Sequence, residues 1–216
     1  QAATNLEVKI INDANASTLA EYYFGAGKGC KNFAMLTLGT GIGGGAVIDG
    51  RLLLGNSSAG AEFGHSVICY NGKKCTCGRN GCLEQYASAT ALCDATKDAM
   101  NLNKQSKMWE VGNLKNITAK TAFDYSCVDE TAKMIVNSYI HYLATGITNI
   151  ANVLRPEIIA LGGGIAKQGN VLIEPLQKLV DNSIFASNQT PKVKIVTAKL
   201  ENSAGLVGAV CPFIKN

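Results

Sequence analysis

The sequence has little charge, because only 17% of its 216 residues are Asp, Glu, Lys or Arg. No run of basic residues is longer than Lys73-Lys74, and the net charge is +4. A basic patch for DNA or RNA is therefore missing, and we expect no nucleic-acid partner for this segment. No apolar run approaches the roughly 20 residues that span a bilayer, and no signal peptide begins the sequence. We expect a globular, cytoplasmic protein without a membrane partner.

Histidine is also scarce, with two in the chain, whereas there are eight cysteines. A chain of this length and aliphatic content does not need disulfides, and five of the thiols are scattered. The other three, Cys75, Cys77 and Cys82, follow His65 closely, in a spacing typical of structural Zn²⁺ sites. The alternative is three ordinary thiols beside a loop histidine. His65 is the better fourth ligand, because we expect His141 inside a long helix.

Hydrophobic periodicity predicts strands that alternate with helices, which is typical of an α/β layered domain. We expect strands over residues 6–11, 33–38, 46–48, 51–54, 158–161 and 193–197. We expect helices over residues 13–24, 83–100, 118–126, 129–154, 172–182 and 203–213. The first strand, Leu6–Ile11, is expected to be buried, and Asp49-Gly50 predicts a hairpin turn. Residues 55–82 are expected to be loop. Without a bound metal, a loop of this length is unusual in a compact domain.

Two glycine clusters follow predicted strands, at Gly39–Gly45 and Gly162–Gly164. Glycine lets backbone N–H groups approach phosphate oxygens, and Thr40 adds a hydroxyl donor to the first cluster. The first cluster is neither a Walker loop nor a Rossmann fingerprint, and a glycine-rich hairpin is more often only a turn. The second cluster follows a strand and opens a helix, as at many nucleotide sites, and is also weak evidence alone.

Three acidic residues complete the candidate chemistry. Asp13 stands where the first predicted strand ends and a helix begins. It is either a helix cap or a carboxylate at the strand end where open α/β sheets place their chemistry. Glu62 and Glu84 flank the proposed zinc ligands, so a metal in the loop would also hold these carboxylates. Carboxylates accept strong hydrogen bonds from hydroxyl groups.

Together the motifs resemble the ROK family of bacterial sugar kinases and sugar-responsive repressors, over nearly the whole chain. In this sequence, NDANASTLAEYYFGAGKG looks like the family's catalytic segment. LTLGTGIGGGAVIDGRLLLG looks like the family's second phosphate turn. The zinc motifs ExGH and CxCGxxGCxE match AGAEFGH and CTCGRNGCLE, and the adenosine motif resembles PEIIALGGGIA. The resemblance implies an actin-like ATPase (ribonuclease H-like) lobe with a zinc-stabilised loop.

The resemblance also implies a role for each motif residue. Asp13 would be the general base that takes the proton from the sugar hydroxyl, and Mg²⁺ would arrive with ATP. The implied sugar-binding residues are Asn12, Glu62, His65 and Glu84. The implied zinc ligands are His65, Cys75, Cys77 and Cys82, so His65 would use one ring nitrogen for zinc and the other for sugar. The implied nucleotide-binding residues are Thr40 and Gly41 at the phosphates, with Gly163 and Gly164 near the adenosine.

Family members also have an N-terminal lobe with a phosphate loop, DxGGT, and this sequence contains no such motif. We therefore expect residues 1–216 to be the C-terminal lobe only, with a zinc loop at residues 62–84 and the N-terminal lobe absent. The missing lobe would supply part of the sugar pocket and a phosphate clamp. The chain alone is then expected to have little kinase activity.

The leading hypothesis is ATP-dependent phosphorylation of a hexose. Glucose is preferred over N-acetylmannosamine, N-acetylglucosamine and fructose because the motifs look most like glucokinases. The alternatives are the sugar-sensing domain of a ROK repressor and a zinc-stabilised interaction module. The intact Asn12-Asp13 and Gly39–Gly45 favour the kinase, since a repressor can lose nucleotide contacts without penalty. The family also implies a homodimer, which the apolar long helix allows.

Overall fold

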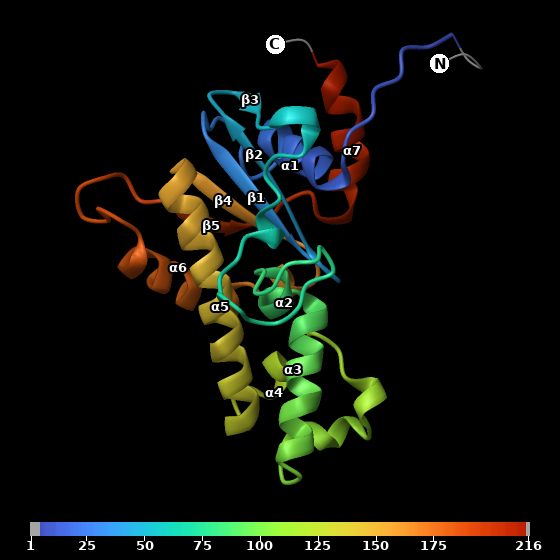
Figure 1. Ribbon diagram of the computed structural model, residues 1–216, viewed down its shortest axis with the longest axis vertical. Coiled ribbons are helices and arrows are strands. Elements are labelled where there is room, and N and C mark those ends of the chain that lie inside the picture. The colour runs from blue at the N-terminus through green and yellow to red at the C-terminus, as the bar shows by residue number, and fades with distance from the viewer. Residues whose placement is uncertain (1–4, 215–216) are drawn as a thin grey trace.

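The computed structural model describes residues 5–214 and, within them, one mixed sheet of five strands in the order β3-β2-β1-β4-β5 (Figure 1). The strands are β1 (Phe33–Leu38), β2 (Ile42–Ile48), β3 (Arg51–Leu52), β4 (Ile158–Gly162) and β5 (Lys194–Thr197). β1 pairs with β2 antiparallel and with β4 parallel, and β4 pairs with β5 parallel. The carboxyl ends of β1, β4 and β5 therefore lie at one edge of the sheet.

Helices cover both faces of the sheet. On one face lie α1 (Asp13–Phe24) and α7 (Ala204–Val210), and on the other lie α5 (Glu130–Leu154) and α6 (Asn170–Ser183) (Figure 1). Because side chains alternate along a strand, Phe33 and Met35 of β1 join the core under α1, whereas Leu36 and Leu38 join the larger core on the α5 side. This double burial explains why β1 is almost uniformly apolar.

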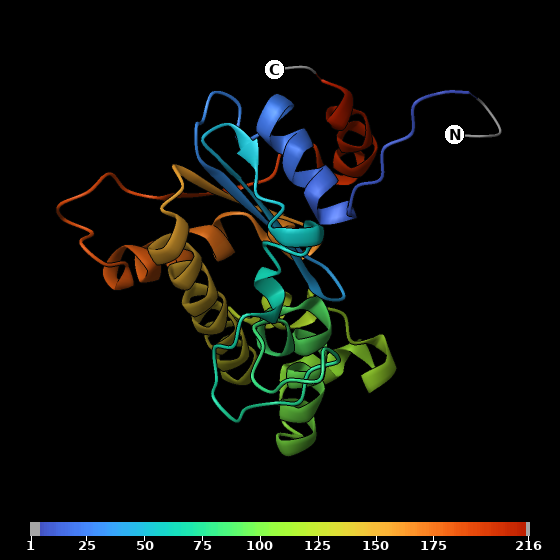
Figure 2. The same ribbon diagram turned by 45° about the horizontal axis from the view of Figure 1, so that its top comes forward.

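Three shorter helices pack around the part of α5 that extends beyond the sheet. They are α2 (Glu84–Ala87), α3 (Ala89–Leu102) and α4 (Thr121–Tyr125) (Figure 2). The single helix predicted over residues 83–100 is thus two helices. Ser88 has extended backbone angles, and its hydroxyl accepts a hydrogen bond from Ala91 N at 3.1 Å. Ser88 is therefore the N-cap of α3, and serine at this position favours the start of a new helix.

Helix α1 lies unusually close to its neighbours on two sides. A Cβ atom at Gly45 of β2 would clash with Thr18 Oγ1, and one at Gly208 of α7 would clash with the backbone of Ala16. The sequence predicted a turn over the whole Gly39–Gly45 cluster, but Gly43–Gly45 belongs to strand β2. These glycines serve close packing of the helix against the sheet, and only the first part of the cluster is a turn.

The predicted strand Leu6–Ile11 is wrong. This segment pairs with no strand within residues 5–214, and Leu6, Val8 and Ile10 are 67%, 54% and 98% exposed. The apolar alternation is typical of a strand, but a strand becomes stable only against a neighbouring strand and a core. Within residues 5–214 no strand pairs with this segment, and only its end, Ile11, packs against the core under α1.

Other local predictions are confirmed. The Asp49-Gly50 turn has φ of 48° and 76°, which matches the left-handed angles that tight hairpins use. Helix α5 ends at Leu154, just before Pro156, which cannot continue a helix. Among the helices of the described residues, none combines the length and apolar character that a membrane crossing needs.

Candidate functional site

A cavity of about 430 Å³ opens at the edge where β1 and β4 end. It is lined by the start of α1, the turn between β1 and β2, the loop before α2 and the glycine turn after β4. The predicted site residues among its lining are Asn12, Asp13, Thr40, Gly41, Glu62, Glu84 and Gly163. The fold therefore brings together residues as far apart in the sequence as Asn12 and Gly163.

The start of α1 presents Asp13 to this cavity. Asn12 Oδ1 accepts hydrogen bonds from Ala14 N at 2.9 Å and Asn15 N at 3.1 Å, so Asn12 is the helix N-cap. Asp13 Oδ1 accepts only from the adjacent Ala14 N, at 2.8 Å. Asn12 is thus the N-cap, and Asp13 is the acid of the first turn, where a carboxylate also favours the helix dipole. Its carboxylate is exposed and lines the cavity.

Hydrogen bonds from α2 and α3 hold the turn at residues 39–41. Glu84, the first residue of α2, accepts a hydrogen bond from Ile42 N on its Oε2 at 2.9 Å. A Cβ at Gly41 would meet the same oxygen, so a larger residue there would push the Glu84 carboxylate aside. Thr90 Oγ1 donates to Thr40 O at 2.8 Å from the start of α3. The Glu84 carboxylate thus belongs both to the turn and to the cavity wall.

Glu62 is brought to the cavity by a loop that lies directly on β2. It precedes a short 3₁₀ turn, Phe63–His65, in which Gly64 is buried. A Cβ at Gly64 would clash with the carbonyl oxygen of Ile42. The loop backbone therefore touches the strand backbone, and this close contact fixes where the exposed Glu62 carboxylate enters the cavity.

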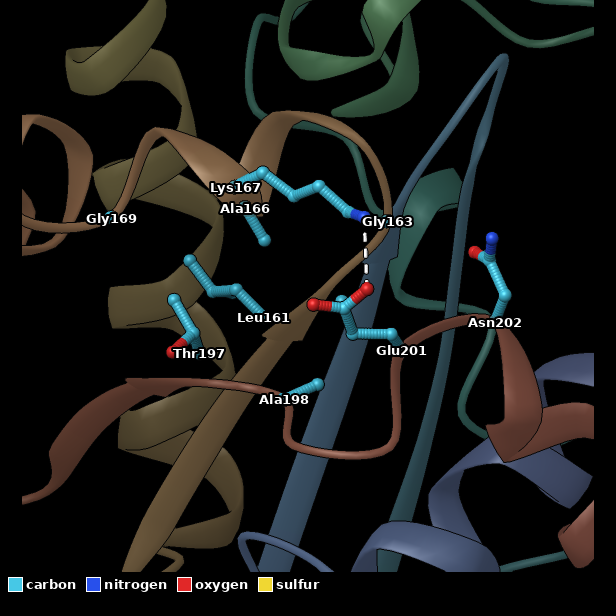
Figure 3. A pocket seen from close by; sticks show the side chains of 10 residues that line it. Leu161, Gly163, Ala166, Lys167, Gly169, Thr197, Ala198, Glu201 and Asn202 are labelled. Carbon is cyan, nitrogen blue, oxygen red and sulfur yellow. Dashed lines mark hydrogen bonds and ion pairs between the residues drawn. The ribbon is translucent and has the colours of Figure 1, made fainter.

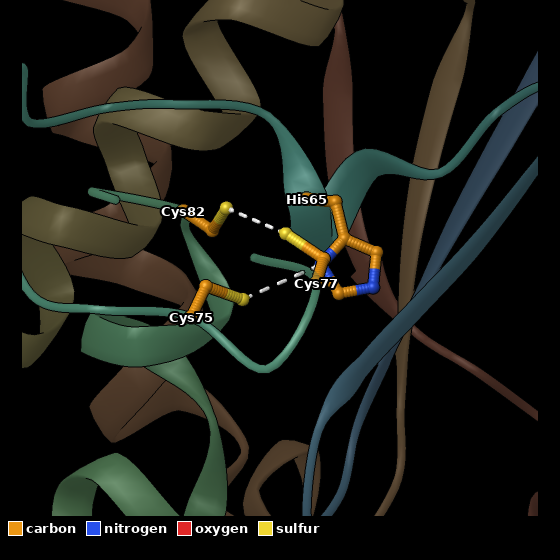
Figure 4. Close-up of side chains that lie close together, drawn as sticks. All are labelled: His65, Cys75, Cys77 and Cys82. Atoms are coloured by element: carbon orange, nitrogen blue, oxygen red, sulfur yellow. Dashed lines mark hydrogen bonds between the residues drawn. The ribbon is translucent and has the colours of Figure 1, made fainter. Parts of the chain in front are cut away.

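The four predicted zinc ligands converge at one point (Figure 4). Their donor atoms, one imidazole nitrogen and three sulfurs, all lie within 4.8 Å of one another. His65 Nδ1 is 3.7 Å from Cys75 Sγ, and Cys77 Sγ is 3.6 Å from Cys82 Sγ. Tetrahedral zinc, with Zn–S bonds of about 2.3 Å, places its sulfur ligands about 3.8 Å apart. The donor set and spacing therefore fit a structural zinc ion.

The thiols of Cys77 and Cys82 differ in pKa. A hydrogen bond from the backbone of Arg79 lowers the pKa of the Cys77 thiol to about 6. Burial raises the pKa of the Cys82 thiol to about 12. Because a metal ligand must be a thiolate, a cation bound here would have to displace the proton from Cys82. None of the eight cysteines, all of which lie within residues 5–214, forms a disulfide.

The second predicted role of His65 is not visible in the cavity. His65 is absent from the lining residues, although its other ring nitrogen lies on the side away from the three sulfurs (Figure 4). The other histidine, His141, is exposed on α5 and lies outside the ligand cluster. The structure therefore brings His65 to the candidate metal site and leaves its sugar contact untested.

A second pocket, of about 310 Å³, adjoins the first along the same sheet edge (Figure 3). Its lining residues are Leu161, Gly162, Gly163, Ala166, Lys167, Gly169, Thr197, Ala198, Glu201 and Asn202. Lys167 Nζ forms an ion pair with Glu201 Oε2 at 2.9 Å across this pocket. Gly163 lines both pockets, with φ of +89° and no room for a Cβ beside Leu38. Gly164 is exposed and lines neither.

Sequence reasoning missed one wall of this second pocket, the segment from Thr197 to Asn202 that follows β5. No motif marks it. The signal that was available is topological, because β5 was predicted as a strand and parallel strands place their carboxyl ends at the same sheet edge. Thr37, near the end of β1, lines the first cavity for the same reason and was also missed.

Comparisons with known proteins agree with the motifs. The glucokinase of Thermotoga maritima is 39% identical over 208 residues, which cover 95% of this chain and 65% of that enzyme. The crystal structure of a ROK glucokinase from Streptomyces griseus, in complex with glucose and AMPPNP, superposes with a TM-score of 0.87 at 32% identity, over 96% of this chain and 68% of that one. The xylose repressor of Caldicellulosiruptor bescii is 28% identical over 100% of this chain and 54% of its own length.

The fold comparison confirms the predicted α/β fold, because the chain superposes on a ROK glucokinase structure. The chain spans just under two thirds of the length of the glucokinases of Thermotoga maritima (65%) and Halalkalibacterium halodurans (63%). A profile of the ROK family matches residues 1–215. Since this match covers almost every residue, the chain belongs to the ROK family.

Proposed function

We propose that this chain is one lobe of an ATP-dependent hexose kinase, with glucose as the preferred acceptor. One observation carries the proposal: Asp13, Glu62, Glu84 and the turn at residues 39–44 line one cavity, and Gly163 joins that cavity to a second pocket. An acid, a polar wall for hydroxyls and a glycine turn are the parts that phosphoryl transfer to a sugar requires.

Sugar recognition is assigned to Asn12, Glu62, Glu84 and His65. Glu84 Oε2 already accepts from Ile42 N, which leaves its other oxygen for a hydroxyl. Asn12 Oδ1 is used for the helix cap, so its side-chain N–H groups remain as donors. Two carboxylates that accept from neighbouring hydroxyls give strong, directional binding of a hexose.

The transfer itself is assigned to Asp13 and the glycine turn. Asp13 accepts the proton of the attacking hydroxyl as general base. Thr40 and Gly41 offer a hydroxyl and backbone N–H groups to the ATP phosphates. Three carboxylates make the cavity negative, so the phosphates need a counter-charge, and we assign it to Mg²⁺ carried by the nucleotide. The adenosine is assigned to the second pocket, beside Gly163, whereas Gly164 lies outside the lining of this pocket.

The cysteine–histidine cluster is assigned to structural zinc. His65, Cys75, Cys77 and Cys82 would fill all four positions, which leaves none open for chemistry. Bound zinc would cross-link a loop that runs from residue 55 to 83 with little regular structure. Its contribution is therefore indirect, because it fixes the loop that carries Glu62 and ends at Glu84.

These 216 residues alone are expected to phosphorylate glucose poorly. Asp13, Thr40 and Glu62 are exposed, so water reaches the cavity freely, whereas phosphoryl transfer requires water to be excluded. We propose that a further lobe, within the third of the glucokinase length that this chain does not span, closes the site. A coupled assay for glucose 6-phosphate checks this, with the full-length protein as the positive control. Turnover by the chain alone that matches the full-length protein would contradict it.

A sugar-sensing domain of a transcriptional repressor is the second candidate, favoured by the similarity to the Caldicellulosiruptor bescii xylose repressor over the whole chain. The two candidates differ in their use of ATP. The kinase predicts turnover of ATP with glucose, and with N-acetylmannosamine, N-acetylglucosamine or fructose as weaker acceptors. The repressor predicts sugar binding without turnover in the full-length protein. A sugar panel with an ATP-consumption assay separates them.

We also propose a homodimer through α5. From Met134 to Leu154 this helix has no Asp, Glu, Lys or Arg, and Met134 and Tyr142 are 56% and 36% exposed. Interface cores are depleted in charge and enriched in Met and Tyr. Sedimentation is expected to show a dimer, and Tyr142→Lys a monomer, because the substitution puts a charge in the interface. A wild-type monomer at high protein concentration would contradict the proposal.

A further inference from the structure

We infer that Glu21, a buried acid with no part in the proposed chemistry, is a positioning residue that sets the nucleotide pocket against the helix that carries Asp13. The identity of the ligand rests on the proposed function. The positioning itself rests on contacts within this chain. Glu21 lies near the C-terminal end of α1 and is 0% exposed.

Both oxygens of Glu21 accept hydrogen bonds from backbone N–H groups outside the helix. Oε2 accepts from Ala26 N at 2.7 Å, just after α1 ends. Oε1 accepts from Leu200 N at 2.6 Å, across 179 positions of sequence. A buried carboxylate is costly unless it is hydrogen-bonded, and its bonds to N–H groups are among the stronger ones in proteins. Leu200 N therefore has a fixed place relative to α1.

Leu200 lies in the middle of the pocket wall that sequence analysis missed. Ala198, Glu201 and Asn202 on either side of it line the second pocket. Glu201 has φ of +46°, a left-handed conformation that is uncommon for a residue with a side chain. Such a conformation persists when surrounding contacts hold it, and the bond from Leu200 N to Glu21 is the contact next to it. The Glu21 bond holds this wall together with the hydrogen bond from Ala198 N to Leu161 O at 2.8 Å and the Lys167–Glu201 ion pair.

Helix α1 thereby connects the two pockets. Its first residue, Asp13, lines the 430 Å³ cavity, and its buried Glu21 holds the wall of the 310 Å³ pocket. The close packing at Gly45 and Gly208 leaves the helix little freedom to shift. A shared rigid element of this kind aligns donor and acceptor, and alignment is the main contribution of a protein to phosphoryl transfer.

The chain offers a matched control in Glu157. Its Oε1 also accepts from two backbone N–H groups far away in sequence, Lys31 N at 2.7 Å and Asn32 N at 3.0 Å. These bonds tie the starts of β1 and β4 together, at the end of the sheet opposite the pockets. Glu157 is exposed and uses one oxygen for both bonds, so glutamine can keep them. Glu157→Gln therefore controls for the loss of a carboxylate charge, at a place where no effect on nucleotide is expected.

The experiment compares Glu21→Gln, Glu157→Gln and wild-type chain by amide hydrogen exchange without nucleotide and by calorimetric titration with ADP. Glutamine keeps the shape of glutamate but turns an NH₂ group against a buried N–H, which leaves a donor unpaired. We expect exchange at residues 198–202 to become at least about tenfold faster in Glu21→Gln, and the Kd for ADP to rise about tenfold, a change of about 1.4 kcal/mol. Glu157→Gln is expected to change neither.

A second variant covers the case in which Glu21→Gln folds poorly. Leu200→Pro removes the N–H on the loop side and leaves Glu21 in place, and the φ of −88° at Leu200 is close to the range of proline. It is expected to give the same two effects. Unchanged exchange at residues 198–202 in both variants would overturn the inference. Failure of the wild-type chain to bind ADP would instead contradict the proposed function, and exchange would still decide the role of Glu21.

Discussion

Replacing Asp13 with asparagine is expected to lower kcat of the full-length protein by roughly 100- to 10,000-fold, the usual effect of losing a general base. The asparagine side chain has the same shape and its oxygen can still accept from Ala14 N, as Asp13 Oδ1 does at 2.8 Å. It cannot take a proton from the sugar hydroxyl. The KM values for glucose and ATP are therefore expected to change little, and a steady-state assay measures both effects.

The matched control for this prediction is Asp94→Asn. Asp94 is an exposed acid on α3 whose carboxylate pairs with Lys97 at 3.4 Å and lines neither pocket. This variant is expected to keep wild-type kcat. Retention of more than about a tenth of wild-type kcat by Asp13→Asn would show that another group takes the proton. An equal loss in both variants would show that the effect is not specific to the cavity.

Replacing Cys82 with serine is expected to remove the metal and destabilise the loop from residue 66 to 83. Structural zinc contributes roughly 10–16 kcal/mol of binding free energy in small zinc domains. We expect the free energy of unfolding to fall by about 3 kcal/mol or more, which lowers the melting temperature by roughly 6–12 °C in a domain of this size. Elemental analysis and thermal unfolding of the purified chain measure these two quantities.

The control for this prediction is Cys69→Ser, in the same loop but outside the ligand cluster. It is expected to keep one zinc per chain and nearly wild-type stability. In the full-length protein, Cys82→Ser is also expected to weaken glucose binding, since the loop carries Glu62 and ends at Glu84. If Cys82→Ser retained stoichiometric zinc, or matched Cys69→Ser in stability, the proposed role of the cluster would be wrong.

The parts of the fold that depend on local pattern were predictable from the sequence. Helix α1 begins at Asp13 and ends at Phe24 as expected, and β1 covers Phe33–Leu38 as expected. Helix α5 was predicted within a residue, because its apolar period is long and Pro156 follows it. In each case one segment contains the whole signal, so no knowledge of distant neighbours was needed.

The errors arise where distant neighbours decide the structure. The segment Leu6–Ile11 has the pattern of a strand but no partner strand within residues 5–214. Gly43–Gly45 has the composition of a turn but is strand, because it pairs with β1, and its glycine at 45 is explained by the close packing of α1. The sequence alone does not show which distant segment will lie against a glycine.

The candidate site likewise contains residues that were predictable from local motifs and residues that were not. Asp13, Glu62 and Glu84 were predicted because they belong to short motifs with a set spacing, and they now line one cavity. The wall from Thr197 to Asn202 and the buried Glu21 were missed, since their importance comes from the bond between Glu21 and Leu200, 179 positions apart. Contacts of that separation leave no pattern in a single sequence.

The most direct measurement of the central claim is a crystal structure of the full-length protein with glucose and AMPPNP. The account predicts glucose in the cavity of about 430 Å³, with its hydroxyls bonded to Glu62 and Glu84. It predicts an Asp13 oxygen within about 3.2 Å of the hydroxyl that faces the terminal phosphate. Glucose bound outside this cavity, or an Asp13 carboxylate turned away from every hydroxyl of the sugar, would contradict it.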